Sequence, residues 1–222
     1  MPRTTRTTAT TEASLDELQL SPALAALAHR AVPRRYRKGV ILIQEGEFGD
    51  TLYIVLSGRI KVFSLGPNDR EITFGLYGVG EFVGEMSLDG GPRAASVITV
   101  EPTTCVVISR PTLLEHIAQY PEFAFELLAK VITRARAATR DARNMALMDS
   151  YGRLVALIDE LAVLQEDGTR CLVRRITHAE IASRIGCSRE MVSRLLKDLE
   201  RGGYTATIDR GLHILKPLPS RW

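Results

Sequence analysis

Residues 176–203 read ITHAEIASRIGCSREMVSRLLKDLERGG, and this stretch decides the fold of the C-terminal part of the chain. Thr177 and Glu180 have the spacing of a capping box, which opens a helix. Gly186 ends that helix, because glycine readily adopts the left-handed backbone of a helix C-terminus. Ser188 can cap a second helix, which stops at the paired glycines. Two helices joined by a short turn predict a helix-turn-helix.

The second helix of this motif has one apolar face and one polar, basic face. Leucine and valine recur at i, i+3, i+4 and i+7, which is the spacing of a buried helix face. Arginine near a helix start can bind O6 and N7 of guanine, and glutamate can accept from N4 of cytosine, so Arg189 and Glu190 are candidate base-reading residues. Ser188, Ser193 and Lys197 are candidate phosphate contacts, which position a protein on DNA without specifying sequence.

The segments around the motif complete a small domain. Residues 205–215, with a turn at 209–211, predict a β-hairpin wing. Upstream, Asp149 or Ser150 can cap a helix over 151–165. The elements expected between that helix and the motif are a closing turn at 166–168 and a short strand over 171–175.

A long helix is predicted over 121–148, because neither glycine nor proline interrupts this range. Its apolar residues recur in steps of three and four, the spacing of a coiled-coil seam: Leu128, Val131, Ala135, Ala138, Ala142 and Met145. The outer face of this helix is expected to be too charged to be buried widely, because it carries four arginines: Arg134, Arg136, Arg140 and Arg143. The pattern favours a homodimer seam over a helix that packs along its own domain.

Residues 36–109 have a β pattern, in which short apolar runs alternate with glycine-rich turns. Such a pattern predicts a small antiparallel roll or barrel, which can enclose one small ligand. The expected strands are 40–43, 51–57, 60–65, 71–76, 95–100 and 104–108. Two short helices flank them: one from Pro22 to about Ala31, capped by Ser21, and one that begins at Pro111 and is broken at Tyr120 and Pro121.

Composition and charge exclude several classes of protein. The chain has 222 residues, of which 45% are hydrophobic and 25% charged, so it is not wholly disordered. No apolar run is long enough to span a bilayer, and residues 1–13 lack the apolar region of a secretory signal, so a cytoplasmic location is expected. Residues 150–222 carry twelve basic and nine acidic residues, a balance that suits a polyanionic partner.

No metal centre or catalytic motif is expected. The three cysteines are widely separated, and none precedes Cys105, which argues against a disulfide framework, a metal knuckle and an iron–sulfur sensor. The histidines show no paired ligand spacing, so neither haem nor another metal is expected. P-loop, GxSxG and HExxH motifs are absent from the sequence, so the chain is not expected to be an enzyme.

Residues 176–194 resemble the recognition segment of the catabolite activator / fumarate-nitrate regulator superfamily, and 186–190 with Arg194 resembles its catabolite activator branch. Residues 38–58 are similar to the opening pattern of that family's cyclic-nucleotide-binding domain, and 84–95 to its phosphate-binding cassette. The resemblance implies an α+β fold with a jelly-roll-like antiparallel β-roll, a long dimerisation helix and a C-terminal winged helix-turn-helix. The expected divisions are a flexible tail at 1–18, a sensor domain at 19–120, a dimerisation helix with hinge at 121–149 and a DNA-binding domain at 150–222.

The cassette contains the candidate ligand-binding residues. Gly84 permits close backbone approach, Arg93 can pair two phosphate oxygens, and Glu85 can accept from a ribose 2′-hydroxyl. Relatives that bind cyclic AMP place hydroxyl residues on the long helix, where this chain has Ala138 and Thr139. The full candidate set is Gly84, Glu85, Met86, Ser87, Arg93, Ala94, Ala95 and Thr139. Cyclic AMP is favoured as the ligand, cyclic di-GMP is the next candidate, and a purely structural cassette is the remaining alternative.

The resemblance implies a homodimeric transcription regulator that a bound nucleotide switches and that binds palindromic double-stranded DNA. Arg189, Glu190 and Arg194 would read TGTGA-like half-sites. Thr177 and His178 would add contacts from the first helix, although close relatives have arginine in place of this histidine. RNA polymerase is a candidate partner. Two other classes stay open: a cyclic-nucleotide-binding scaffold without DNA function, and a phosphodiesterase-like enzyme that uses a Glu–Arg pair.

Overall fold

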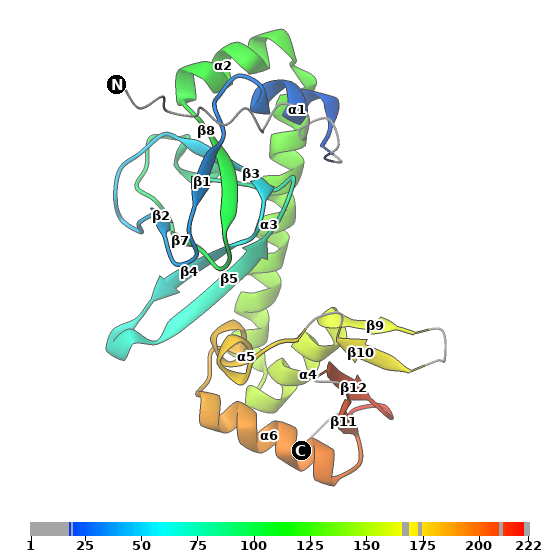
Figure 1. Ribbon diagram of the computed structural model, residues 1–222. Helices are drawn as coiled ribbons and strands as arrows, with labels where there is room; N and C mark the ends of the chain where they lie inside the picture. The colour runs from blue at the N-terminus through cyan, green and yellow to red at the C-terminus, as the bar shows by residue number, and fades with distance from the viewer. Residues whose placement is uncertain (1–17, 19, 166–168, 173–174, 209–210, 220–222) are drawn as a thin grey trace, which may run out of the picture. The chain divides into compact units, whose positions relative to one another are not determined.

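The computed structural model describes residues 18, 20–165, 169–172, 175–208 and 211–219 (Figure 1). The chain divides into two compact units, the first comprising 1–64 and 75–134 and the second 65–74 and 135–222. The predicted tail at 1–18 lies outside the described residues except for its last residue. The α+β class expected from the sequence is confirmed.

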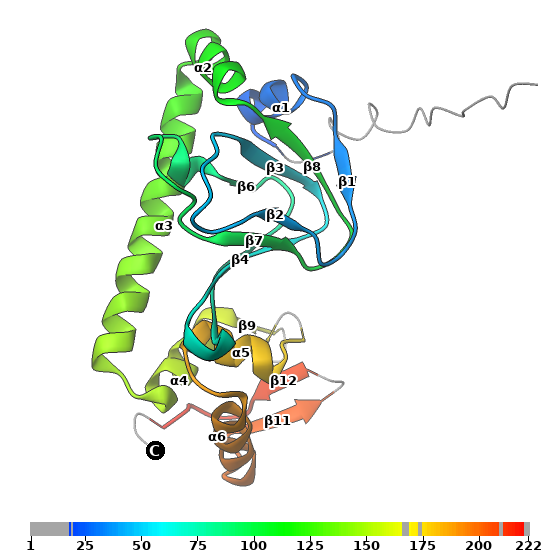
Figure 2. The same cartoon turned by 90° about the vertical axis from the view of Figure 1, so that its left-hand side faces the viewer.

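Two four-stranded sheets form the β-roll (Figure 2). The first has the order β1 (Arg34–Tyr36), β8 (Thr103–Ile108), β3 (Leu52–Ser57), β6 (Phe82–Val83). The second has the order β2 (Ile41–Ile43), β7 (Ser96–Thr99), β4 (Ile60–Leu65), β5 (Glu71–Tyr77). Strand β8 pairs antiparallel with β1 and β3, and β7 with β2 and β4. The sequence pattern missed β1 and β6, because two or three residues are too few to show a period.

The interior of the roll is apolar and lies between the two sheets. One buried cluster joins Ile43 and Val97 of the second sheet to Val55 and Cys105 of the first. Cys105 is fully buried, and burial raises the pKa of its thiol to about 12, so it acts as a small core residue.

Three helices belong to this part of the chain: α1 (Pro22–Ala28), α2 (Arg110–Gln119) and α3 (Glu122–Leu147). Helix α1 begins at the predicted Ser21 cap, whose hydroxyl accepts from the backbone N–H of Leu24. It ends at Ala28, three residues before the predicted Ala31, because the next backbone hydrogen bonds, from Arg30 to Leu27 and from Ala31 to Ala28, join residues three apart and do not continue the α-helix. Phe123 at the start of α3 is fully buried in the cluster that α1 and the first sheet share.

The winged helix-turn-helix has the elements that the sequence predicts and one further strand, β9 (Figure 1). They are α4 (Ser150–Leu161), β9 (Ala162–Leu164), β10 (Arg170–Leu172), α5 (His178–Ile185), α6 (Arg189–Arg201), β11 (Thr205–Ile208) and β12 (Gly211–Ile214). Asp149 caps α4, its carboxylate accepting from the backbone N–H of Gly152 at 2.7 Å. Leu154, Val192 and Leu199 are completely buried where α4 and α6 meet.

One helix boundary of this domain was predicted wrongly. The helix expected over 151–165 ends at Leu161, and Ala162–Leu164 instead forms β9, paired antiparallel with β10. This pairing satisfies the backbone groups that a longer helix would have satisfied internally, so tertiary structure overrides local helix propensity. The predicted turn at 166–168, part of the strand over 171–175 and part of the turn at 209–211 lie outside the described residues.

Candidate ligand pocket and DNA-binding surface

The phosphate-binding cassette begins directly after β6. Gly84 has φ 99° and ψ −1°, a left-handed backbone that favours glycine. A Cβ at this position would overlap the carbonyl oxygen of Thr51, so no side chain fits. The next three residues, Glu85–Ser87, form one 3-10 turn (η3) in which Glu85 and Ser87 are buried. The glycine therefore lets the chain turn tightly enough to bring Glu85 inward.

Arg93 is a buried cation at the centre of the cassette, with 7% of its surface exposed. Its Nη1 donates to the carbonyl of Gly84 at 3.1 Å and to Oγ of Ser87 at 2.7 Å. Its Nη2 donates to the carbonyl of Thr51 at 3.0 Å and to Oγ1 of the same residue at 2.9 Å. Among the described residues, no carboxylate forms an ion pair with this guanidinium. Burial lowers the pKa of Arg93, which is the cost of holding a cation among neutral acceptors.

Glu85 is the second buried charge of the cassette, and it is paired. Its carboxylate accepts from Nη1 of Arg134 on α3 at 2.7 Å, with 4% of the Glu85 side chain and 18% of the Arg134 side chain exposed. Burial alone would lower the pKa of Arg134, but the ion pair with Glu85 raises it overall. The same guanidinium donates to the carbonyl of Phe82 at 2.6 Å and lies 4.5 Å from the centre of the Tyr77 ring. Arg134 thus holds the cassette carboxylate in a defined orientation.

The sequence analysis assigned Arg134 to the exposed outer face of the long helix, and this was wrong. The signal that could have found it is a helical stripe, because Phe123, Leu127, Lys130 and Arg134 follow one another at i, i+4, i+7 and i+11. All four are buried or half-buried. Lys130 also pairs with Glu81 at 2.5 Å, so this face of α3 carries two cations toward two carboxylates.

The other predicted ligand-binding residues lie less deeply. Met86 is 64% exposed, Ala94 is exposed and Ala95 is half-buried. Thr139 is exposed on α3 within the second unit, and its hydroxyl donates to the carbonyl of Ala135 on its own helix at 3.0 Å. The structure therefore brings Gly84, Glu85, Ser87 and Arg93 together in one buried network, whereas a ligand contact from Thr139 stays a prediction.

The helix-turn-helix is built by the caps that the sequence predicts. Oγ1 of Thr177 accepts from the backbone N–H of Glu180 at 3.2 Å and begins α5. Gly186 ends α5 with φ 65°, and Oγ of Ser188 accepts from the backbone N–H of Met191 at 3.2 Å to begin α6. Gly186 and Ser188 therefore fix the end of α5 and the start of α6, and with it the position of the first exposed residues of α6.

A hollow with a volume of about 790 Å³ lies between α5, α6 and the wing. Ser188, Glu190 and Arg194 lie outside this hollow and are exposed, and Arg194 donates to Sδ of Met191 at 3.0 Å. Arg175 lines the hollow as a further cation, which sequence reasoning did not single out, and Glu200 is its acidic residue. The predicted DNA contacts that line it are Thr177, His178, Arg189, Ser193 and Lys197. The hollow is therefore mainly cationic, as a surface that faces phosphates should be.

In the part of the chain that the structure describes, no group of three or more His, Cys, Asp and Glu side chains could hold a metal ion. No helix among the described residues is long and apolar enough to cross a membrane.

Comparison with known proteins gives a domain match for each of the two parts of the chain that contain these residues. Residues 33–120 match the cyclic nucleotide-binding domain, and 152–217 match the Crp-like helix-turn-helix domain. The chain is 33% identical over 186 residues to a CRP-like cAMP-activated global transcriptional regulator of Mycobacterium tuberculosis, covering 82% of this chain and 83% of that protein. It is 32% identical over 212 residues to the CRP-like protein Clp of Xanthomonas euvesicatoria, covering 90% and 89%.

A solved structure gives the same result at the level of the fold. The c-di-GMP responsive global regulator CLP of Xanthomonas campestris superposes with a TM-score of 0.76 at 26% identity, covering 88% of this chain and 99% of that one. Two domain matches in the same order, and relatives above 30% identity over most of the chain, leave one assignment. The chain belongs to the CRP/FNR superfamily of ligand-responsive, DNA-binding transcription regulators.

Proposed function

We propose that this chain is a homodimeric transcription regulator of the cytoplasm that cyclic AMP switches, and that it has no catalytic activity. The observation that carries the proposal is the buried guanidinium of Arg93, which has neutral acceptors but no carboxylate partner among the described residues. A buried cation is stable when an anion lies beside it, and a phosphate offers two oxygens to the arginine fork. Ser87 and Thr51, whose hydroxyls now accept from Arg93, are the groups that a phosphate would displace or contact.

The charges in the pocket favour a mononucleotide. Arg93 is a buried cation that has no acidic partner in the described part of the chain, so it suits one phosphate. Glu85 has a second carboxylate oxygen that can accept from a ribose hydroxyl while Arg134 holds the first. Cyclic di-GMP is the second candidate, because the structurally similar protein CLP is described as a c-di-GMP responsive regulator. A cyclic dinucleotide has two phosphates, and the second would have to find a cation other than Arg134, which Glu85 already engages.

The orientation of Glu85 by Arg134 leads to a prediction for ligand affinity. Replacing Arg134 with alanine should weaken cyclic AMP binding by about tenfold, because the buried carboxylate would lose its partner and its fixed position while Arg93 would still bind the phosphate. Calorimetric titration of the folded variant measures this loss. Arg136→Ala is the matched control, since Arg136 is exposed two residues further along α3. Equal affinities in the Arg134 variant and the wild type would show that Arg134 does not contribute to the pocket.

The dimer is proposed to form along α3. Several apolar side chains of this helix are exposed in the single chain, with 75% of Phe125, 51% of Leu128 and 41% of Ile132 accessible. Together with Ala135, Ala138, Ala142 and Met145 they form a stripe that a second copy would cover. Two-fold symmetry would place the two recognition helices about 34 Å apart on a palindromic duplex. Ligand can shift this arrangement only through different affinities for its two states.

A charge introduced into the stripe should break the dimer. Ala138→Glu would bury two carboxylates against each other in the α3 seam, so we expect mainly monomer at micromolar concentration. Light scattering measures the mass directly. Thr133→Glu introduces the same charge at an exposed position outside the predicted seam and should leave the dimer intact. A dimer that survives Ala138→Glu would place the interface elsewhere.

On DNA, Arg189, Glu190 and Arg194 are proposed to read the bases of TGTGA-like half-sites. Thr177, His178, Ser188, Ser193 and Lys197 are proposed to contact the backbone. RNA polymerase is the proposed protein partner, as a regulator that binds promoters would require.

A further inference from the structure

The hollow of the DNA-binding domain contains a hydrogen-bonded pair that joins its two helices. His178 is the first residue of α5 and is exposed, and its Nδ1 lies 2.8 Å from Oγ of Ser193 on α6. Both side chains line the hollow between α5, α6 and the wing. Because Nδ1 is engaged with Ser193, Nε2 is the ring nitrogen left to contact a DNA phosphate.

The charges around this ring are mostly positive. Arg175 precedes α5, and Arg189 and Lys197 of α6 line the same hollow. Glu200 is the acidic residue that lines the hollow. Glu190 and Asp198 of α6 and Glu180 of α5 are on the packed helices but are not part of the lining. The strands of the wing line the hollow with neutral residues. A DNA phosphate bound in the hollow would bring negative charge to the ring, and a nearby negative charge favours the protonated form of a histidine.

We propose that His178 is a proton-linked phosphate contact, so that the protein takes up one proton at this ring when each half-site of DNA is bound. This inference rests on the DNA-binding surface proposed above. In the neutral ring, Nδ1 accepts the hydroxyl proton of Ser193. When a proton from solvent is added, Nδ1–H donates to Oγ of Ser193, and the hydroxyl proton turns to a phosphate oxygen. Nε2–H donates to the same phosphate. Proton uptake thus adds one positive charge and one hydrogen-bond donor to the contact.

The consequence is DNA affinity that rises as the pH falls through the range where histidine titrates. Binding that takes up protons is strengthened by acid, and it weakens as the pH rises and the ring becomes neutral. Between about pH 8 and about pH 6 we expect a gain of about fivefold for each half-site. A phosphate contact does not depend on base sequence, so the gain applies to any duplex.

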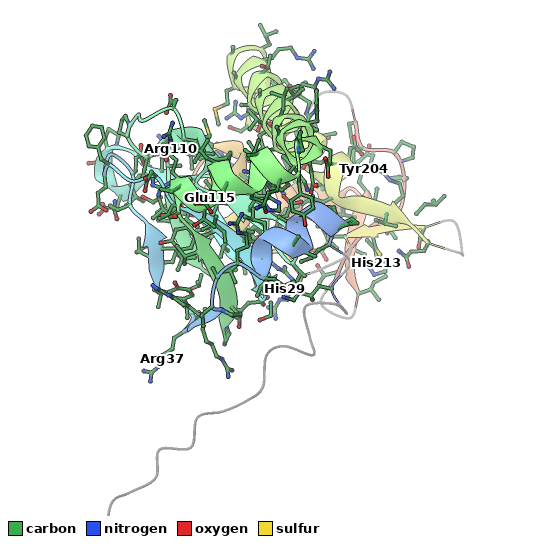
Figure 3. The ribbon with its side chains drawn as sticks, turned by 90° about the horizontal axis from the view of Figure 1, so that it is seen from above. His29, Arg37, Arg110, Glu115, Tyr204 and His213 are labelled. Atoms are coloured by element: carbon green, nitrogen blue, oxygen red, sulfur yellow. The ribbon has the colours of Figure 1, made fainter. Side chains whose placement is uncertain are left out.

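The test measures fluorescence anisotropy of a labelled random-sequence duplex with the full-length dimer at constant ionic strength, near pH 6 and near pH 8. His178→Gln should bind at both pH values and lose the gain that the wild type shows. His178→Arg carries a fixed charge, so it should bind with little pH dependence and, near pH 8, more tightly than the wild type. The matched control is His213→Gln in the wing, labelled in Figure 3 and absent from the lining of the hollow, which should keep the wild-type gain.

Two results would overturn the inference. If His178→Gln keeps the full gain, the proton is taken up elsewhere, although DNA binding itself would stand. If the wild type binds the duplex equally at both pH values, no proton is linked to binding. Failure of the wild type to bind any duplex at low salt is a different result, because it would contradict the proposed DNA-binding surface as well.

Discussion

Cyclic AMP should bind the Arg93→Ala variant more than about a hundredfold more weakly than the wild type. In this variant the phosphate would lose the two charge-assisted hydrogen bonds that we propose it receives from the guanidinium, each of which contributes about 1.5–3 kcal/mol. Calorimetric titration of protein stripped of nucleotide measures the loss. The effect should be larger than that of Arg134→Ala, because Arg93 is proposed to contact the phosphate directly, whereas Arg134 would act through Glu85.

Arg93 also stabilises the cassette, and the experiment has to separate the two roles. Its guanidinium joins Thr51, Gly84 and Ser87 through four hydrogen bonds, so alanine should lower the thermal midpoint as well. Arg93→Lys keeps the charge without the planar fork and should lose affinity with less loss of stability. Arg37→Ala is the control, since Arg37 is exposed and points away from the roll in Figure 3. Full affinity in a folded Arg93→Ala protein would place the phosphate elsewhere.

The Arg189→Ala variant should lose most of its preference for a TGTGA palindrome over a scrambled duplex. Arg189 is the first residue of α6, is exposed and lines the hollow of the DNA-binding domain. A bidentate contact to guanine contributes about 1–3 kcal/mol of discrimination, and a symmetric dimer makes the contact twice. We therefore expect the ratio of specific to non-specific affinity to fall roughly a thousandfold at about 2 kcal/mol per half-site.

Competition between the two duplexes over a series of salt concentrations measures this ratio. Salt-sensitive binding should persist in the Arg189 variant, because phosphate contacts from other residues remain. Arg201→Ala removes an exposed arginine from the last turn of the same helix and should leave the preference unchanged. An Arg189 variant that still prefers the palindrome as strongly as the wild type would show that another residue reads the guanine.

Local signals explain which parts of the fold could be predicted from sequence. The helix-turn-helix follows from the caps at Thr177 and Ser188 and from Gly186, each of which acts within four residues of its own position. Helix α3 follows from an uninterrupted helical sequence, and its observed range lies within the predicted one. Strand β9 could not be predicted, because its residues become a strand only through pairing with β10, which lies further along the chain.

The ligand pocket shows the same limit at the level of side chains. Glu85 and Arg93 could be identified from the cassette pattern, but their partners come from distant parts of the sequence. Thr51 lies 42 residues before Arg93, and the Arg134 that holds Glu85 belongs to another element. An arginine among other arginines on a long helix looks exposed, and only its contacts with Glu85 and the Tyr77 ring show that it faces inward.

The most direct test of a nucleotide-switched regulator is calorimetric titration of cyclic AMP into the folded, nucleotide-free protein, with cyclic di-GMP titrated in parallel. We predict saturable binding of about one cyclic AMP for each chain, because each chain contains one cassette with a buried Arg93. Saturation by cyclic di-GMP alone would contradict cyclic AMP as the ligand, but it would still support a regulator that a nucleotide switches. No binding heat from either nucleotide at several temperatures, in protein that stays folded, would contradict the central claim.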